Sequence, residues 1–108
     1  MSYKISTIPL FDKQAKRLAK KYTSIKADLI ALIESLKTQP TQGIALGNNF
    51  YKIRLAISAK GKGKSGGARV ITYSKVTATT VYLSSIYEKG EKETISTKEL
   101  EGIFKMIP

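Results

Sequence analysis

The chain has 108 residues, a formal net charge of +11, and neither cysteine nor histidine. This length fits a single domain, residues 1–108, with a modest hydrophobic core. The missing residue types exclude a disulfide framework and the usual zinc ligands, and we expect no metal and no small-molecule cofactor. No apolar run approaches the roughly 20 residues that span a bilayer, and the N-terminal segment lacks the long apolar core of a signal peptide. We therefore expect a cytoplasmic protein without a membrane partner.

The N-terminal half predicts one strand followed by two helices. Residues 3–8 alternate and are rich in β-branched side chains, which is typical of a strand, and Pro9 suits the first turn of a helix. Apolar residues then recur at helical spacing in two stretches, separated by a break at residues 23–24 that can cap the second helix. The two apolar faces comprise Phe11, Ala15, Leu18 and Tyr22, and then Ile25, Leu29, Leu32, Ile33 and Leu36. Pro40 and Gly43 end the second helix, and the short break predicts a helical hairpin.

The C-terminal half changes to strands and ends in a third helix. Residues 50–57 alternate with the two-residue period of a strand, and residues 68–74 and 79–89 are two further strand-like segments with short joins. Ser96 and Glu99 fit a capping box, which predicts a helix start. Its apolar stripe comprises Leu100, Ile103, Phe104 and Ile107. The order β-α-α-β-β-β-α predicts an α+β fold, with a small, mainly antiparallel sheet and helices packed mainly on one face.

The positive charge is concentrated in the middle of the chain. No acidic residue lies between Glu34 and Glu88. The cations of this span are Lys37, Lys52, Arg54, Lys60, Lys62, Lys64, Arg69 and Lys75. Such an unbalanced field indicates a polyanionic partner, usually nucleic acid, although a basic surface without a partner would have the same composition.

The segment AKGKGKSGGARV, residues 59–70, joins two of the predicted strands. Its GKGKSG stretch has the glycine spacing of a dinucleotide-binding loop, but that loop must open a helix and be followed by an acid. The overlapping GKS lacks the upstream glycine and the helix of a nucleoside triphosphate-binding loop. Two interpretations are left. The segment is either a flexible, soluble connection, or a clamp in which Lys60, Lys62 and Lys64 hold RNA phosphates while glycines let the backbone come close.

A second cluster of cations lies on one face of the predicted sheet. Lys52 and Arg54 are two residues apart on one strand, or about 7 Å by strand rise. Arg69 joins them if the register of the next strand allows, and Tyr87 and Lys89 lie two residues apart at the end of the last strand. We expect this face to be solvated, because unpaired buried charge is costly.

These residue types suit the cleavage of RNA by its own 2′-hydroxyl group. The hydroxyl must lose a proton, the charge of the phosphorane must be neutralised, and the leaving 5′-oxygen must regain a proton. Arginine neutralises charge through its bidentate fork, and lysine can act as base or acid. Tyrosine can relay a proton or stack on a base, which makes Tyr73 a candidate RNA contact. A basic face that binds RNA without cleaving it would contain the same residues.

Nearly the whole chain resembles the RelE/ParE superfamily of toxins, most closely its RelE-type, HigB-like branch. The resemblance rests on the element order and on YKIRL at 51–55, GKGKSGGARVITY at 61–73 and LSSIYEKGEKETIS at 83–96. It implies a RelE-like microbial ribonuclease fold and the toxin of a type II toxin–antitoxin pair. Such a toxin binds a cognate antitoxin, enters the ribosomal A site and cleaves the mRNA there without a metal.

The resemblance also implies roles for individual residues. Lys52 and Arg54 match the basic pair implicated in proton transfer and phosphate contact, and Arg69 matches the arginine that stabilises the transition state. Lys89 lies near an arginine that is linked to the leaving group in some members, and Tyr87 fits the tyrosine of their IYxK variant. Other members use a histidine or a tyrosine of the last helix. This chain has neither, which leaves the general base open.

Two other functions stay open on the sequence alone. A ParE-like, non-enzymatic inhibitor of DNA gyrase would share the fold, but that branch generally lacks the basic set found here. A non-catalytic RNA-binding module would bind RNA in a salt-dependent manner without cleaving it. The main prediction is a ribosome-dependent mRNA endonuclease, or mRNA interferase, whose antitoxin covers the basic face or replaces the C-terminal helix.

Overall fold

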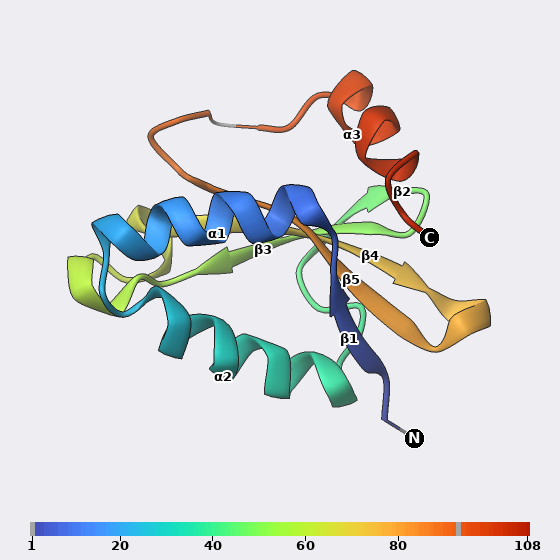
Figure 1. The fold of residues 1–108 in the computed structure, drawn as a ribbon, viewed down its shortest axis with the longest axis horizontal. Helices are drawn as coiled ribbons and strands as arrows, with labels where there is room; N and C mark the ends of the chain where they lie inside the picture. Colours follow the sequence, from blue (N-terminus) through green and yellow to red (C-terminus); the bar gives the residue numbers. More distant parts are fainter. Residues whose placement is uncertain (1, 93) are drawn as a thin grey trace.

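A computed structural model describes residues 2–92 and 94–108 of the chain (Figure 1). Within these residues there are three α-helices and five strands. In chain order they are β1 (Lys4–Thr7), α1 (Pro9–Lys21), α2 (Ile25–Thr38), β2 (Ile44–Gly47), β3 (Phe50–Leu55), β4 (Ala68–Lys75), β5 (Thr80–Glu88) and α3 (Thr97–Phe104). Every helix in this part of the chain is too short or too polar to cross a lipid bilayer.

The five strands form one sheet in the order β1-β5-β4-β3-β2. β1 runs parallel to β5, and all other neighbours are antiparallel. The α+β class, the N-terminal helical hairpin, the mainly antiparallel sheet and the C-terminal helix are therefore confirmed. β2 is an additional strand that the sequence prediction did not contain.

The helical hairpin supplies one side of the core. Its buried residues are Phe11 and Leu18 of α1 and Ile25, Leu29, Leu32 and Leu36 of α2, as their spacing predicted. α1 also contacts β5 directly, because Gln14 Oε1 accepts hydrogen bonds from Ser85 Oγ and the Ile86 amide, both at 3.0 Å. Figure 1 shows α2 on one side of the strands and α3 on the other. α1 contacts both β5 and α2, so the hairpin links the sheet to its helical side.

The predicted capping box starts α3. Ser96 Oγ accepts a hydrogen bond from the Glu99 amide at 3.1 Å, and the Glu99 carboxylate accepts one from the Ser96 amide at 3.2 Å. Further along α3, the ring of Phe104 lies 5.7 Å from that of Tyr73, which lies 5.0 Å from that of Phe50. This aromatic row fixes α3 over the start of β3 and the end of β4, on the sheet face that carries the predicted cations.

β2 pairs with β3 through a two-residue turn. Asn48 and Asn49 have φ values of 52° and 69°, which is the left-handed pair of a tight hairpin turn and suits asparagine. Gly43 precedes β2 with a φ of 100°, and a side chain there would meet the Lys52 carbonyl oxygen at 2.5 Å. The Gly43 and Asn-Asn signals were present in the sequence. The strand between them is only four residues long and mostly exposed, so it shows little alternation.

Candidate functional site

Three cations converge on a hollow at the β2–β3 edge of the sheet. The hollow has a volume of about 410 Å³ and is lined by Gln42, Gly43, Ile44, Lys52, Ile53, Arg54 and Lys64. Lys52 is half-buried, whereas Arg54 and Lys64 are exposed. None of the residues that line it among residues 2–92 and 94–108 is acidic. The hollow is therefore suited to hold an anion such as a phosphodiester between two strand cations and one loop cation.

The register of the strands aligns a row of predicted site residues across the sheet. Arg54 of β3 lies opposite Arg69 of β4, and Arg69 lies opposite Tyr87 of β5. Side chains directly opposite one another have Cβ atoms about 5 Å apart, and like charges in that position are destabilising. The sequence prediction that Arg69 joins Lys52 and Arg54 on one face is confirmed by this register.

Arg69 is buried, contrary to the solvated face that the sequence predicted. Only 6% of the residue is exposed. Its Nη1 donates to the carbonyl oxygens of Lys64 at 3.0 Å and Ala68 at 3.1 Å, and Nη2 donates to Ser65 O at 3.5 Å. These acceptors offset part of the cost of burial, because a buried charge with hydrogen-bonded donors costs less than one whose donors have no partner. Arg69 thus ties the glycine-rich segment to β4 and holds Lys64 near the hollow.

Tyr87 is also buried, at 2% exposure. Its hydroxyl oxygen has no hydrogen-bond partner among residues 2–92 and 94–108. Burial raises the pKa of this phenol, Arg69 acts to lower it, and the charge of Glu99 raises it further. Lys92 covers one side of the ring, with Nζ 5.2 Å from its centroid. Tyr87 is therefore a neutral phenol near pH 7, able to donate a proton and lying beneath the segment that leads to α3.

The remaining predicted residues, the catalytic candidate Lys89 and the RNA contacts, fall in different surroundings. Lys62 and Lys89 are exposed. Lys60 instead donates to Glu88 at 3.3 Å and lies over the ring of Tyr22, at 5.7 Å from its centroid. Tyr73 is half-buried and contacts the rings of Phe50 and Phe104. Lys64 is the one member of the predicted clamp that lines the hollow among the described residues.

The start of the glycine-rich segment is anchored to α2 by polar contacts that the sequence did not reveal. The Asp28 carboxylate accepts hydrogen bonds from Ser58 Oγ at 2.6 Å, the Ser58 amide at 3.0 Å and Ser24 Oγ at 2.8 Å. Burial acts to raise the pKa of Asp28, but these hydrogen bonds outweigh it and lower the pKa. Ser24 Oγ in turn accepts from the Ala59 amide at 2.8 Å. The same serine was predicted only as a helix cap, and no spacing rule links it to residue 59.

The segment is fixed at its far end as well. A side chain at Gly67 would place a Cβ atom 2.0 Å from the Leu55 carbonyl oxygen, so the close approach to β3 requires glycine there. Between the two anchors, Gly61 and Gly63 have positive φ and open space around them. The segment is therefore a connection held at both ends, with an exposed basic tip.

Comparisons with known proteins bear directly on this arrangement. Residues 10–107 match the sequence model of the family described as the RelE toxin of the RelE / RelB toxin-antitoxin system. The chain belongs to the RelE toxin family. No curated protein sequence matches it.

Two solved structures of the Escherichia coli RelE toxin share the fold. One is an arginine-to-alanine double mutant in the free state, with a TM-score of 0.67 and 16% sequence identity, and 100% of each chain is covered. The other is the isolated toxin, with a TM-score of 0.54, 17% identity and coverage of 98% of this chain and 100% of that one. The RelE fold is therefore retained although most side chains differ. Membership of the RelE family also implies an antitoxin as partner.

Proposed function

We propose that this RelE-family toxin is a ribosome-dependent mRNA endonuclease that cleaves by 2′-hydroxyl attack. The observation that carries the proposal is the hollow where Lys52, Arg54 and Lys64 converge beside the buried Arg69–Tyr87 pair, with no acidic residue among the described residues that line it. A phosphodiester in this hollow would meet cations from two elements that are fixed relative to one another. Preorganised charge of this kind stabilises a phosphorane more than it stabilises the ground state.

The reaction assigns one task to each residue. The 2′-hydroxyl loses its proton to a base, the freed oxygen attacks phosphorus, and the bond from phosphorus to the 5′-oxygen breaks as that oxygen takes up a proton. Half-buried Lys52 is our candidate for proton transfer at the attacking oxygen. Exposed Arg54 is positioned to contact the phosphate through its bidentate fork, and Lys64 holds a flanking phosphate.

Arg69 and Tyr87 act from the two strands beyond Arg54, β4 and β5, in this proposal. Arg69 adds positive charge from within the sheet, where low exposure weakens solvent screening. Tyr87 is a candidate proton donor to the leaving oxygen, because its hydroxyl group carries a proton and has no hydrogen-bond partner in the described residues. Contact between Tyr87 and RNA requires that Lys92 and the segment carrying it move aside. Lys89, exposed at the end of β5, is a further phosphate contact in this arrangement.

The antitoxin has an apolar surface available at α3. A groove of about 330 Å³ runs between α3 and the β2–β3 turn, lined in part by Leu46, Phe50, Leu100 and Phe104. Phe104 is 53% exposed although it lies on the helix face that touches the sheet. An antitoxin segment that fills this groove or displaces α3 would block the site. The toxin would then stay inactive in the cytoplasm while the antitoxin is bound. Phe104→Asp should then weaken co-purification with the antitoxin but leave mRNA cleavage intact. Unchanged co-purification would show that the antitoxin does not bind in this groove.

The decisive experiment is primer extension on a defined mRNA, with the protein added to translating ribosomes and, separately, to naked mRNA. We expect cleavage only with ribosomes, within the A-site codon. Lys52→Ala and Arg54→Ala should each lower the cleavage rate by about 10²–10⁴-fold, whereas Lys26→Ala, on an exposed position of α2, should not. Full cleavage by both site variants would remove these residues from the reaction. Salt-dependent RNA binding without cleavage would instead support a non-catalytic RNA-binding module.

A further inference from the structure

We propose that Gln42 reads the nucleobase beside the cleaved bond and favours a base with an amino group at C4 of a pyrimidine or C6 of a purine. This inference rests on the proposed function, and it concerns which RNA the hollow at the β2–β3 edge accepts rather than the chemical step. Gln42 follows α2, is half-buried, and lines that hollow together with the cations Lys52, Arg54 and Lys64.

The side-chain amide of Gln42 is held in one orientation by its neighbours. Its Nε2 donates hydrogen bonds to Ser35 Oγ at 2.9 Å and to the Gln39 carbonyl oxygen at 3.3 Å. Ser35 Oγ donates its own proton to the Leu32 carbonyl oxygen at 2.8 Å, so toward Gln42 it can only accept. A carbonyl oxygen also only accepts, so the group that faces both neighbours is the amide nitrogen. Both protons of Nε2 are therefore used within the fold.

The other half of this amide is an unused acceptor. Oε1 of Gln42 accepts no hydrogen bond from residues 2–92 or 94–108. The remaining described residues that line the hollow are glycine, isoleucine, lysine and arginine, whose side chains contain no acceptor. A role in capping the end of α2 explains the two hydrogen bonds of Nε2, but it leaves Oε1 without a function. A donor on the bound RNA would complete it.

An exposed apolar side chain lies next to Gln42 in the same hollow. Ile44 is 50% exposed, and it lies opposite Lys52 in the β2–β3 register, so their Cβ atoms are about 5 Å apart on one sheet face. Between Gln42 and Ile44, the α-carbon of Gly43 packs against the Lys52 carbonyl group and holds this stretch close to β3. A base can therefore rest on Ile44 with its edge toward Gln42, while its phosphate meets the cations.

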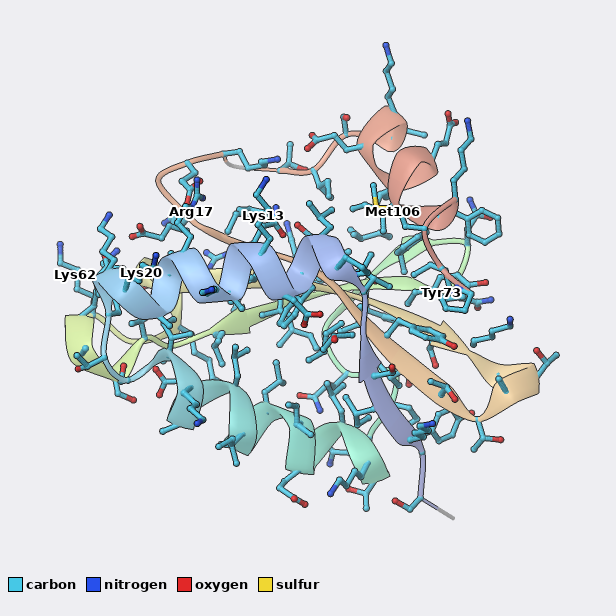
Figure 2. All side chains as sticks on the ribbon, viewed as in Figure 1. Lys13, Arg17, Lys20, Lys62, Tyr73 and Met106 are labelled. Carbon is cyan, nitrogen blue, oxygen red and sulfur yellow. The ribbon has the colours of Figure 1, made fainter. Side chains whose placement is uncertain are left out.

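The residue that the sequence suggested for stacking on a base lies elsewhere. Figure 2 shows Tyr73 beneath α3, with Lys62 at the opposite end of the structure. The ring of Tyr73 lies 5.7 Å from that of Phe104, and Tyr73 is absent from the described residues that line the hollow. Gln42 is therefore the candidate for reading a base within the hollow itself.

The free acceptor predicts a direction of preference. Cytosine N4 and adenine N6 are amino groups that can donate to Oε1, whereas uracil and hypoxanthine carry a carbonyl oxygen at the same ring position. Two oxygens in this position repel one another and leave both acceptors without a donor. One hydrogen bond between neutral groups corresponds to about a 2–10-fold difference in cleavage rate. We expect this preference at one position of the codon, the one whose base lies against Gln42.

The test uses ribosomes with an empty A site, programmed with synthetic mRNAs that differ in one base at each A-site codon position in turn. The pairs are cytosine with uracil and adenine with hypoxanthine, which keep the ring size and exchange the amino group for a carbonyl oxygen. Single-turnover cleavage at saturating ribosomes is measured by primer extension for the wild type, Gln42→Met and Gln39→Met. Gln39→Met makes the same substitution at an exposed side chain outside the hollow and keeps the backbone carbonyl group that contacts Gln42.

The ratios of rates, rather than the rates, carry the result. At one codon position the wild type should cleave cytosine faster than uracil, and adenine faster than hypoxanthine, by about 2–10-fold. Gln42→Met should bring both ratios to about 1, because its side chain has no comparable acceptor, and Gln39→Met should keep them. A purely structural role for Gln42 would slow cleavage of all four substrates alike and leave the ratios unchanged.

The outcomes separate the two proposals. If the wild type cleaves none of the mRNAs, the proposed function fails and the base preference with it. If the wild type cleaves but neither ratio exceeds 1 at any codon position, only the inference about Gln42 fails. Ratios that persist in Gln42→Met, or that disappear equally in Gln39→Met, would also overturn it.

Discussion

Glu88 provides the sharpest quantitative test of how the site is held together. Its carboxylate accepts hydrogen bonds from Tyr22 Oη at 2.7 Å, Lys21 Nζ at 2.8 Å and Lys60 Nζ at 3.3 Å. It thereby joins the end of α1, the last strand and the start of the glycine-rich segment. The hydrogen bond from Lys21 is the largest of the effects that lower the pKa of Glu88 from 4.5 to about 2, against the opposing effect of burial.

The stabilisation follows from this pKa. A fall from 4.5 to about 2 corresponds to about 3 kcal/mol at 1.36 kcal/mol for each pKa unit. We expect about 2 kcal/mol in practice, because the Lys21 side chain is 61% exposed and solvent screens the pair. The folded pKa is lower than the unfolded one, so this stabilisation is fully present above about pH 5 and is lost as the pH falls toward 2.

The perturbation is Glu88→Gln, which keeps the shape of the side chain and removes the charge. Urea unfolding at pH 7 should show a loss of about 2 kcal/mol, and at pH 3 a much smaller one, because the wild type has by then lost most of the same stabilisation. Glu34→Gln, which removes an exposed ion pair with Lys37, should cost less than about 0.5 kcal/mol at either pH. Equal losses for Glu88→Gln at pH 7 and pH 3 would refute the electrostatic argument.

Three further predictions concern the connections around the hollow. Arg69→Lys keeps the positive charge but loses the bidentate guanidinium group. Amide hydrogen exchange of residues 64–66 should therefore become faster and mRNA cleavage slower. Unchanged exchange would mean that the hydrogen bonds from Arg69 to the carbonyl oxygens do not hold the segment. Tyr87→Phe removes a hydroxyl group that has no partner in the described structure. The free energy of unfolding should stay unchanged or rise by up to about 1 kcal/mol. If Tyr87 is the proton donor, the same variant must cleave mRNA more slowly. Asp28→Ala removes the acceptor for Ser58 and should cost about 1 kcal/mol in urea unfolding, with faster exchange at residues 58–59. Faster exchange only in other segments would contradict the prediction that Asp28 anchors residues 58–59.

The positions of Lys52 and Arg54 could be predicted because strand alternation alone places them on one face. Their neighbour Lys64 could not, because its position depends on Arg69 reaching back to its carbonyl oxygen. The burial of Arg69 and Tyr87 could not be predicted from the sequence either, since it depends on which segment lies over them. Lys60 shows the opposite case, where the charge that suggested RNA binding is used by Glu88 within the fold.

The sequence by itself determined the elements whose signals are local. The apolar periods of α1 and α2, the capping box of α3 and the alternation of β3 arise from residues within a few positions of one another. Only the tertiary structure decided the strand order, the short β2, the parallel pairing of β1 with β5, and the meeting of Lys64 with the strand cations. These depend on contacts between residues far apart in the chain, and such contacts form only where the packed core and its buried hydrogen bonds bring the segments together.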